Sequence, residues 1–357
     1  MNFDIEVSDE IKEVLEKECG ELNRKDIEIM YGAKGDSLKA LMLYADFKRE
    51  EICGNVVTYV VNRNINFTNL CIGSCQFCAF RNKNGFLLPF SEIKKRVREA
   101  LKLKATEVCI QGGLHPDIDL EFYVEILNCV REVSDSIHIH AFSPMEVYYG
   151  AKKSRVTVKS AIRTLRENGL GSMPGTAAEI LSKKTRSKIC PSKLGVSRWI
   201  KVIETAHKEG VPTTATMMYG HIEDIKERAK HLEIIKKIQE KTHGFTEFVP
   251  LTFIHENTGI KNYATGAEDI RTYAISRIFF DREIPNIQVS WVKLGPKFAE
   301  LCLLAGANDI GGTLYEENIS KSAGSPYGSY MPVAEMRRII EDIGRVPMER
   351  DTLYNYI

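Results

Sequence analysis

Apolar and polar positions change from a helical spacing to a strand-like alternation near residue 58. Before that point, Ile11, Val14 and Leu15, and then the stretch from Ser37 to Phe47, place apolar residues three and four apart, which predicts amphipathic helices. After it, short β-branched runs alternate with helical stretches. We therefore predict a helical N-terminal extension (residues 1–58), a β/α body (59–345) and a C-terminal tail (346–357).

The body contains eight short runs of apolar or β-branched residues, each followed by a helical stretch. The runs are VVTYVVNRNINFT, TEVCIQG, SIHIHAF, GLGSMPG, PTTATMMYG, TEFVPLTF, NIQVSW and ANDIGG. Eight β/α repeats make a closed parallel barrel. An open, doubly wound sheet shows the same alternation, but no GxGxxG turn follows the first run. The pattern therefore favours an α/β fold of the parallel (β/α)8 TIM-barrel type.

Two of the predicted helices carry particular signals. Ser91 is placed to cap a helix with Ile93, Val97 and Leu101 on one face, and residues 223–241 repeat apolar positions at helical spacing. In a parallel barrel the loops after the strands gather at one mouth, where reactive groups lie. We expect the site to form from the polar and Gly-rich segments that follow the first six runs.

Composition narrows the function classes. The 357 residues carry a formal net charge of +1 with no basic cluster, so nucleic acid is not the expected partner. The acidic, amphipathic N-terminus is unlike a signal peptide, and no stretch reaches the ~18 apolar residues of a membrane span. We expect a cytoplasmic protein without a membrane partner. Its nine cysteines, an odd number, are then expected to be reduced.

Three of these cysteines, Cys71, Cys75 and Cys78, stand at the spacing Cys-x-x-x-Cys-x-x-Cys inside NINFTNLCIGSCQFCAF. Three thiolates on a tight loop can hold one face of a four-iron cluster and leave the fourth iron open to a second molecule. The alternative is zinc, with a histidine such as His115 or His255 as fourth ligand. The other cysteines are isolated, and we interpret them as small buried hydrophobic residues.

The triad, with Phe77 before its last cysteine, resembles the signature of the radical S-adenosylmethionine (radical SAM) enzymes. The blocks FTNLCIGSCQFCAF, QGGLHPDIDLEFY, IHIHAFSPMEV, GLGSMPGTAAEIL, TTATMMYGHIED and GFTEFVPLTFIHENTG are similar, one after another, to the CofH family of FO synthase subunits, over nearly the whole chain from about residue 20. The resemblance implies one [4Fe-4S] cluster on Cys71, Cys75 and Cys78, with the fourth iron open to S-adenosyl-L-methionine, and a reductant or electron donor.

The resemblance also implies a reaction. The enzyme would cleave L-tyrosine at Cα–Cβ and add the 4-hydroxybenzyl fragment to 5-amino-6-(D-ribitylamino)uracil, releasing 2-iminoacetate, methionine and 5'-deoxyadenosine. The adduct leads to FO, the precursor of coenzyme F-420. Because the chain has one triad, we expect a separate ring-closing subunit of FO synthase (CofG) as functional partner. The alternatives are a sister radical SAM activity, such as aminofutalosine synthase or a tyrosine lyase, and a structural metal-binding protein.

Cofactor-binding roles are expected for residues near the triad and after the next three runs. Glycines of a strand-ending turn allow backbone to approach a ligand closely, and an arginine fork suits a carboxylate. The alternatives are an ordinary turn and a solvated salt bridge. On this reasoning and the resemblance, the expected S-adenosylmethionine-binding residues are Phe77, Gln111, Gly112, Gly113, Ser143, Glu179 and Arg186.

Catalytic or substrate-binding roles are expected for polar residues at the ends of the third, fifth and sixth runs. His138 and His140 are two apart, so they share one face of a strand, and His140 is nearer the mouth. The alternative for either is a buried histidine with a hydrogen-bonded neighbour. The predicted catalytic residues are His140, Tyr219, His221 and His255, with Glu247 and Asn257 as further candidates for substrate recognition.

Overall fold

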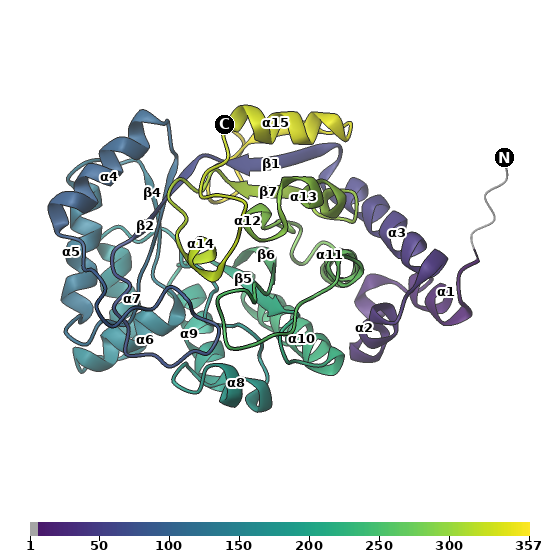
Figure 1. The fold of residues 1–357 in the computed structure, drawn as a ribbon, viewed down its shortest axis with the longest axis horizontal. Helices are drawn as coiled ribbons and strands as arrows, with labels where there is room; N and C mark the ends of the chain where they lie inside the picture. Colours follow the sequence, from purple (N-terminus) through teal and green to yellow (C-terminus); the bar gives the residue numbers. More distant parts are fainter. Residues whose placement is uncertain (1–5) are drawn as a thin grey trace.

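Parallel strands form a ring at the centre of the molecule. The computed structural model describes residues 6–357 (Figure 1). The strands are β1 (Val56–Val60), β2 (Asn62–Asn66), β3 (Glu107–Gln111), β4 (His138–Ala141), β5 (Thr213–Tyr219), β6 (Phe245–Thr252), β7 (Asp309–Gly312) and β8 (Val346–Glu349). β3 lies between β2 and β4, β5 pairs with β6, and β7 pairs with β1, all in parallel.

Single parallel bridges join these pieces into a ring. The bridges are His140–Ser172, Met173–Thr213, Phe248–Ile287, Gln288–Asp309 and Arg63–Tyr315. The fourth and seventh runs of the sequence are thus reduced to bridges at residues 172–173 and 287–288, but they hold the predicted places in the order. The prediction of a parallel β/α barrel is confirmed.

Helices surround the ring (Figure 1). They are α4 (Phe90–Lys102), α5 (Leu120–Arg131), α6 (Pro144–Lys153), α7 (Val158–Glu167), α8 (Lys183–Ile189), α9 (Val196–Lys208), α10 (Ile225–Thr242), α11 (Gly266–Phe280), α12 (Trp291–Leu294), α13 (Pro296–Leu303), α14 (Ile319–Ala323) and α15 (Val333–Asp342). Within residues 6–357, none of the helices combines the length and the apolar character that crossing a bilayer requires.

The start of α4 differs from the prediction. Extended Pro89 is the N-cap, so Ser91 lies inside the first turn and caps nothing. The buried face consists of Ile93, Val97 and Ala100, whereas Leu101 is 37% exposed. A step of three from Val97 keeps Ala100 on the buried face, because one helical turn takes 3.6 residues.

The N-terminal segment packs on the outside of the barrel. It contains α1 (Asp9–Leu15), a 3-10 turn at Cys19–Glu21, α2 (Arg24–Tyr31) and α3 (Gly35–Cys53), which lie beside α10 and α11 (Figure 1). Arg271 of α11 donates to the carbonyl of Ala33 at 2.7 Å. The predicted boundary at residue 58 falls within β1, and residues 1–5 of the predicted extension lie outside the described residues.

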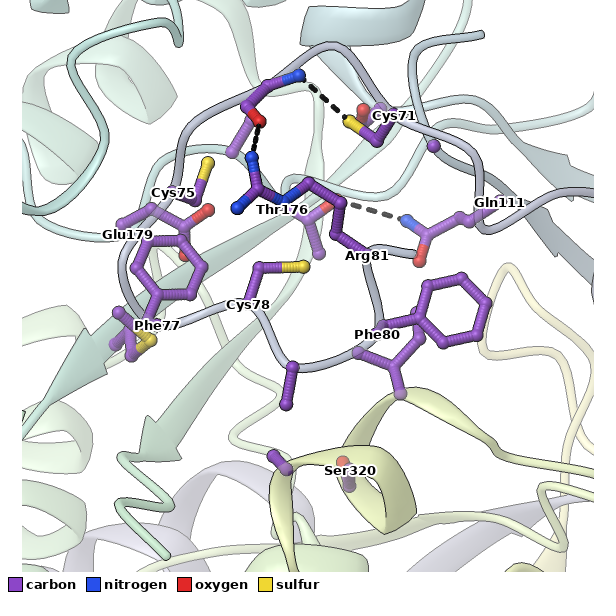
Figure 2. A pocket seen from close by; sticks show the side chains of 18 of the residues that line it. Cys71, Cys75, Phe77, Cys78, Phe80, Arg81, Gln111, Thr176, Glu179 and Ser320 are labelled. Atoms are coloured by element: carbon purple, nitrogen blue, oxygen red, sulfur yellow. Dashed lines mark hydrogen bonds between the residues drawn. The ribbon is translucent and has the colours of Figure 1, made fainter. Parts of the chain in front are cut away.

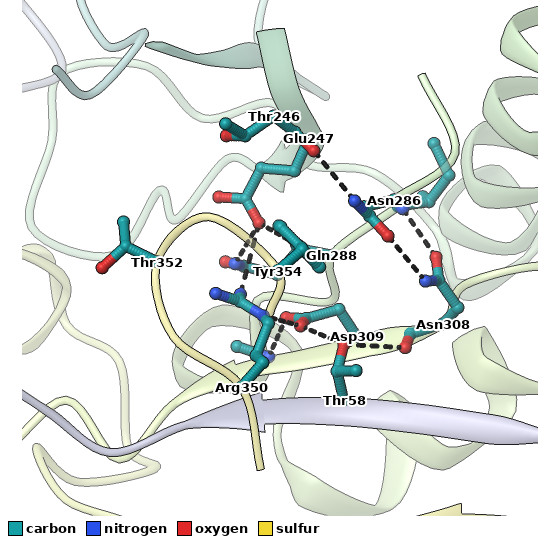
Figure 3. A network of polar contacts seen from close by, with 12 residues as sticks. Thr58, Thr246, Glu247, Asn286, Gln288, Asn308, Asp309, Arg350, Thr352 and Tyr354 are labelled. Carbon is teal, nitrogen blue, oxygen red and sulfur yellow. Dashed lines mark hydrogen bonds and ion pairs between the residues drawn. The ribbon is translucent and has the colours of Figure 1, made fainter. Parts of the chain in front are cut away.

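The C-terminal segment belongs to the barrel. β8 runs parallel to β1, and the residues after it join a polar network (Figure 3). The network includes Glu107 and Asp309, the first residues of β3 and β7, so it lies at the base of the ring, opposite the loops that follow the strands. There Arg350 Nε lies 2.5 Å from Asp309 Oδ2, Thr352 donates to Glu107 at 2.8 Å, and Tyr354 donates to Glu247. Residues 346–357, predicted as a tail, thus contribute a strand and polar contacts that close the base.

Candidate active site

A cavity of about 360 Å³ lies among the loops that follow the strands (Figure 2). Its lining comes from segments after β2, β3, β4 and β6, from residues 176–179 and from α12 and α14. Most of the residues singled out from the sequence lie together here. They are Cys71, Cys75, Phe77, Cys78, Gln111, Gly112, Gly113, Ser143 and Glu179.

The loop after β2 holds the three clustered cysteines at the edge of the cavity (Figure 2). Cys71 Sγ accepts hydrogen bonds from the backbone N–H of Gly73 and of Leu114, each at 3.3 Å. Burial raises the pKa of Cys75, and the nearby Lys193 ammonium opposes that rise. All nine cysteines are free thiols. Two backbone N–H groups therefore point at one sulfur of the loop.

The histidines considered as a fourth zinc ligand lie away from the cavity lining. His115 accepts from the N–H of Asp117 at 3.2 Å, and His255 stacks on Tyr263 with ring centroids 5.0 Å apart. Within the part of the chain described here, no three His, Cys, Asp or Glu side chains converge as ligands of a single metal ion do.

Gly112 and Gly113 line the cavity, but their lack of a side chain serves the protein's own packing. A Cβ on Gly113 would collide with the carbonyl oxygen of Leu70 and lie 2.9 Å from Cys71 Cβ, and one on Gly112 would lie 2.5 Å from the ring of Phe67. These glycines therefore let the cysteine loop and the core approach the end of β3. The predicted role of Gly112 and Gly113 in binding S-adenosylmethionine stays a prediction beside this structural one.

Ser143 and Glu146 tie the start of α6 to this turn. Ser143 Oγ donates to Glu146 Oε2 at 2.6 Å, and Glu146 Oε1 accepts from the N–H of Gly112 at 3.0 Å. Burial raises the pKa of Glu146 to about 7. Glu146 had no predicted role, although the Ser-x-x-Glu spacing of a capping box is present in the sequence.

Glu179 and Arg186 do not act as a pair. Every hydrogen bond that the Arg186 guanidinium makes is to backbone carbonyls: Ala177, Ala178 and Ile180 on one side, Leu194 on the other. Its side chain is buried and absent from the cavity lining. Glu179 forms its ion pair with Lys193 instead. Arg186 therefore fixes the loop that carries Glu179, and its role as a ligand of the cofactor stays a prediction.

His140 and Tyr219, predicted as catalytic, are buried outside the cavity lining. His140 Nδ1 lies 2.7 Å from Ser172 Oγ, and Tyr219 donates to Asp269 Oδ1 of α11 at 2.7 Å. Met218, one residue earlier on β5, lines the cavity. Alternation along the strand therefore turns Tyr219 toward the helix layer.

His221 and His255 are also outside the lining of this cavity. His221 is buried, with Nδ1 2.8 Å from Glu223 Oε2 and Nε2 3.1 Å from the carbonyl of Met218. His255 lines a second cavity of about 910 Å³, which meets the first at Phe253, Ile254 and Lys293. Of the further candidates, Glu247 lies in the network at the barrel base and Asn257 bonds the carbonyl of Ser322.

Two lysines of the cavity were not found from the sequence. Lys193 pairs with Glu179 and lies over the ring of Phe77, 5.2 Å from its centroid. Lys293 lines both cavities. Neither residue sits in a motif, and each reaches the cavity only through the fold.

Family models match most of the chain. Residues 65–235 match the radical SAM superfamily, and residues 242–357 match the CofH/MqnC C-terminal region. The chain is 53% identical, over 97% of its length and 98% of the relative's, to the 5-amino-6-(D-ribitylamino)uracil--L-tyrosine 4-hydroxyphenyl transferase of Methanocaldococcus jannaschii. It is 55% identical to the transferase of the same name from Archaeoglobus fulgidus, over 88% of this chain and 92% of that one.

Solved structures of lower identity share the fold. Methylornithine synthase (PylB) matches with a TM-score of 0.74 at 18% identity, over 95% of this chain and 97% of its own. The FeFe-hydrogenase maturase HydG from Carboxydothermus hydrogenoformans matches with a TM-score of 0.76 at 15% identity, over 97% of this chain and 80% of its own. Both likenesses support the barrel architecture.

Proposed function

This chain belongs to the CofH family of radical SAM enzymes, and from that premise we propose that it transfers the 4-hydroxybenzyl group of L-tyrosine to 5-amino-6-(D-ribitylamino)uracil. Its other products are 2-iminoacetate, methionine and 5'-deoxyadenosine. The observation that carries the proposal is identity of 53% and 55% to transferases of this name over nearly the whole chain. The region that matches the radical SAM superfamily contains the cysteine loop, and the region that matches the CofH/MqnC family contains the second cavity.

The family implies a [4Fe-4S] cluster and S-adenosylmethionine, and we assign the cluster to Cys71, Cys75 and Cys78. When bound, the reduced cluster and S-adenosylmethionine together supply a 5'-deoxyadenosyl radical. The donor set fits, because three free thiols share one loop at the cavity and one of them already accepts two backbone N–H groups. Gln111, held at 3.0 Å by donating to Thr176, borders the same space.

The remaining cavity residues orient ligands and exclude water. Phe77 and the apolar side chains after β6 cover the cavity, which shields a reactive fragment from solvent. The Ser143–Glu146–Gly112 contacts hold the turn after β3 at a fixed position beside Cys71. The ion pair of Glu179 and Lys193 places one negative and one positive charge near Cys75.

The chain carries one Cys-x-x-x-Cys-x-x-Cys triad and, in this proposal, generates one radical site. The FO ring needs two carbon–carbon bonds between the tyrosine fragment and the uracil. We therefore assign ring closure to a second radical SAM enzyme, the partner subunit of FO synthase, and the uncyclised adduct to this chain.

The test is anaerobic incubation of the reconstituted protein with S-adenosylmethionine, a reductant, L-tyrosine and the ribitylaminouracil, followed by mass analysis. The adduct should form without the visible fluorescence of FO. Cys78→Ala should lose iron and adduct together, whereas Cys129→Ala, a buried cysteine of α5 away from the cavity, should keep both. Release of p-cresol with the uracil left unchanged would instead identify a tyrosine lyase, and fluorescent FO from the pure chain would contradict the single-bond assignment.

A further inference from the structure

The carboxylate of the tyrosine substrate needs a charged or polar partner inside the cavity. A carboxylate that leaves water without a compensating partner loses several kcal/mol of hydration free energy. The cations that line the cavity within residues 6–357 are Arg81, Lys193 and Lys293. Which of them is available therefore decides where the amino-acid end of tyrosine can lie.

Two of these cations already have partners. Arg81 donates to the carbonyl of Gly73, inside the cysteine loop. Lys193 is paired with Glu179 and lies over the ring of Phe77. The side-chain ammonium of Lys293, by contrast, makes neither a hydrogen bond nor an ion pair within residues 6–357, although the backbone N–H of this residue donates to the carbonyl of Ser290.

Lys293 stands on a firmly held element. Trp291 of α12 donates through Nε1 to the carbonyl of Gly312 at 2.9 Å, and the carbonyl of Val292 accepts from the Ser325 hydroxyl. Both Trp291 and Val292 are buried. The backbone under Lys293 is therefore fixed, so the fold sets the point from which its side chain enters the cavity.

The surroundings of Lys293 suit a zwitterionic aromatic ligand. Leu251, Phe253 and Ile254, at and after the end of β6, line the same cavity and offer apolar surface to a phenol ring. Burial lowers the pKa of Lys293, and the nearby carboxylates of Glu317 and Glu179 oppose that shift. An incoming carboxylate would stabilise the ammonium further, because an opposite charge in a low-dielectric site favours the charged form.

We propose that Lys293 binds the α-carboxylate of L-tyrosine, at the boundary where the two cavities meet. This inference rests on the proposed function, since it concerns that reaction's amino-acid substrate. The competing source of a carboxylate is S-adenosylmethionine, which belongs beside the cysteine loop, where Lys193 already lies. The position of Lys293 on α12, shared with the second cavity, favours tyrosine.

Equilibrium dialysis of the reconstituted protein tests this directly, with L-tyrosine and with tyramine, which has the same ring and amine but no carboxylate. Lys293→Met should weaken tyrosine binding about 10- to 100-fold and leave tyramine binding unchanged, because only tyrosine loses a charge-assisted contact. Lys293→Arg should keep most of the affinity for tyrosine. Lys297→Met, a matched change of an exposed lysine in the second cavity, should behave like the wild type.

Three results would overturn the inference. They are unchanged tyrosine affinity in Lys293→Met, an equal loss for tyrosine and tyramine, and a loss of S-adenosylmethionine affinity as large as that for tyrosine, which would assign the lysine to the cofactor. Wild-type protein that binds no tyrosine at all would contradict the proposed function itself, so the two failures are distinguishable.

Discussion

His140 lies inside the barrel, where its Nδ1 is 2.7 Å from a serine hydroxyl that His138 also contacts, at 2.8 Å. Burial disfavours the imidazolium and lowers the pKa of His140 from 6.5 to about 4, although Glu107 opposes the shift. The side chain is therefore neutral near pH 7. The structure thus shows His140 as a buried, hydrogen-bonded histidine, which was the alternative interpretation of this residue.

The stability of the protein should report this shift. Between pH 6.5 and 4 the unfolded chain binds a proton at His140 that the folded chain does not, so the stabilisation present above pH 6.5 is lost as the pH falls. Lowering the pH from about 7.5 to 5 should remove about 2 kcal/mol through this residue. Over the same pH interval, the free energy of unfolding of His140→Gln should fall by about 2 kcal/mol less than that of the wild type, as measured by urea unfolding. Equal losses in the two proteins would contradict the assignment.

At the scale of elements, the loop between residues 174 and 182 has a defined backbone conformation that α8 holds in place. Ala177 and Glu179 both adopt positive φ, 63° and 45°, which is unfavourable for residues with a Cβ. Arg186 of α8 holds this backbone because its guanidinium donates to the carbonyls of Ala177 and Ile180. The N–H of Met218 on β5 donates to the carbonyl of Glu179 at 2.7 Å and fixes the loop to the barrel.

Arg186→Lys should loosen this element. A lysine ammonium has fewer donors than the guanidinium and lacks its planar fork, so buried carbonyls lose partners. We expect a loss of about 2–4 kcal/mol in the free energy of unfolding and faster hydrogen exchange at the Met218 amide. Arg163→Lys on α7, where the arginine is half-exposed and pairs with Glu209, should cost under about 0.5 kcal/mol. If the Met218 amide exchanged as slowly in Arg186→Lys as in the wild type, Arg186 would not be what holds this loop.

At the scale of the whole molecule, the two ends of the barrel differ in structure. The mouth holds the cavity, whereas the base is filled by a polar network to which the last residues of the chain contribute (Figure 3). Arg350 connects Asp309 of β7 with Glu247 of β6, and Asp309 also accepts from Thr58 of β1 at 2.5 Å. The C-terminal segment therefore fastens the strands where the ring closes.

Removing the cation from this network should destabilise the entire barrel. Arg350→Met leaves the buried carboxylates of Asp309 and Glu247 without a positive partner, and we expect a loss of about 3–5 kcal/mol in urea unfolding at pH 7. Adding Asp309→Asn to that variant should recover part of the loss, because one unpaired charge disappears. If Arg350→Met unfolded at the wild-type urea concentration, the network would have no part in closing the barrel.

The sequence by itself determined the features that depend on neighbours along the chain. A spacing of two or of 3.6 residues separated strands from helices, which predicted the barrel and the order of its strands. The cysteine spacing and the neighbouring blocks predicted the radical SAM family, which the matches of residues 65–235 and 242–357 confirm. The roles of the individual cavity residues stay predictions.

Only the tertiary structure decided which polar side chains face the cavity. Tyr219 and Met218 are adjacent on β5, yet one contacts α11 and the other lines the cavity. Arg186 bonds backbone carbonyls, and Lys293 reaches the cavity from a four-residue helix with no motif. The physical reason is that such contacts join residues far apart in the chain, so strand register and loop conformation set them, and local periodicity specifies neither.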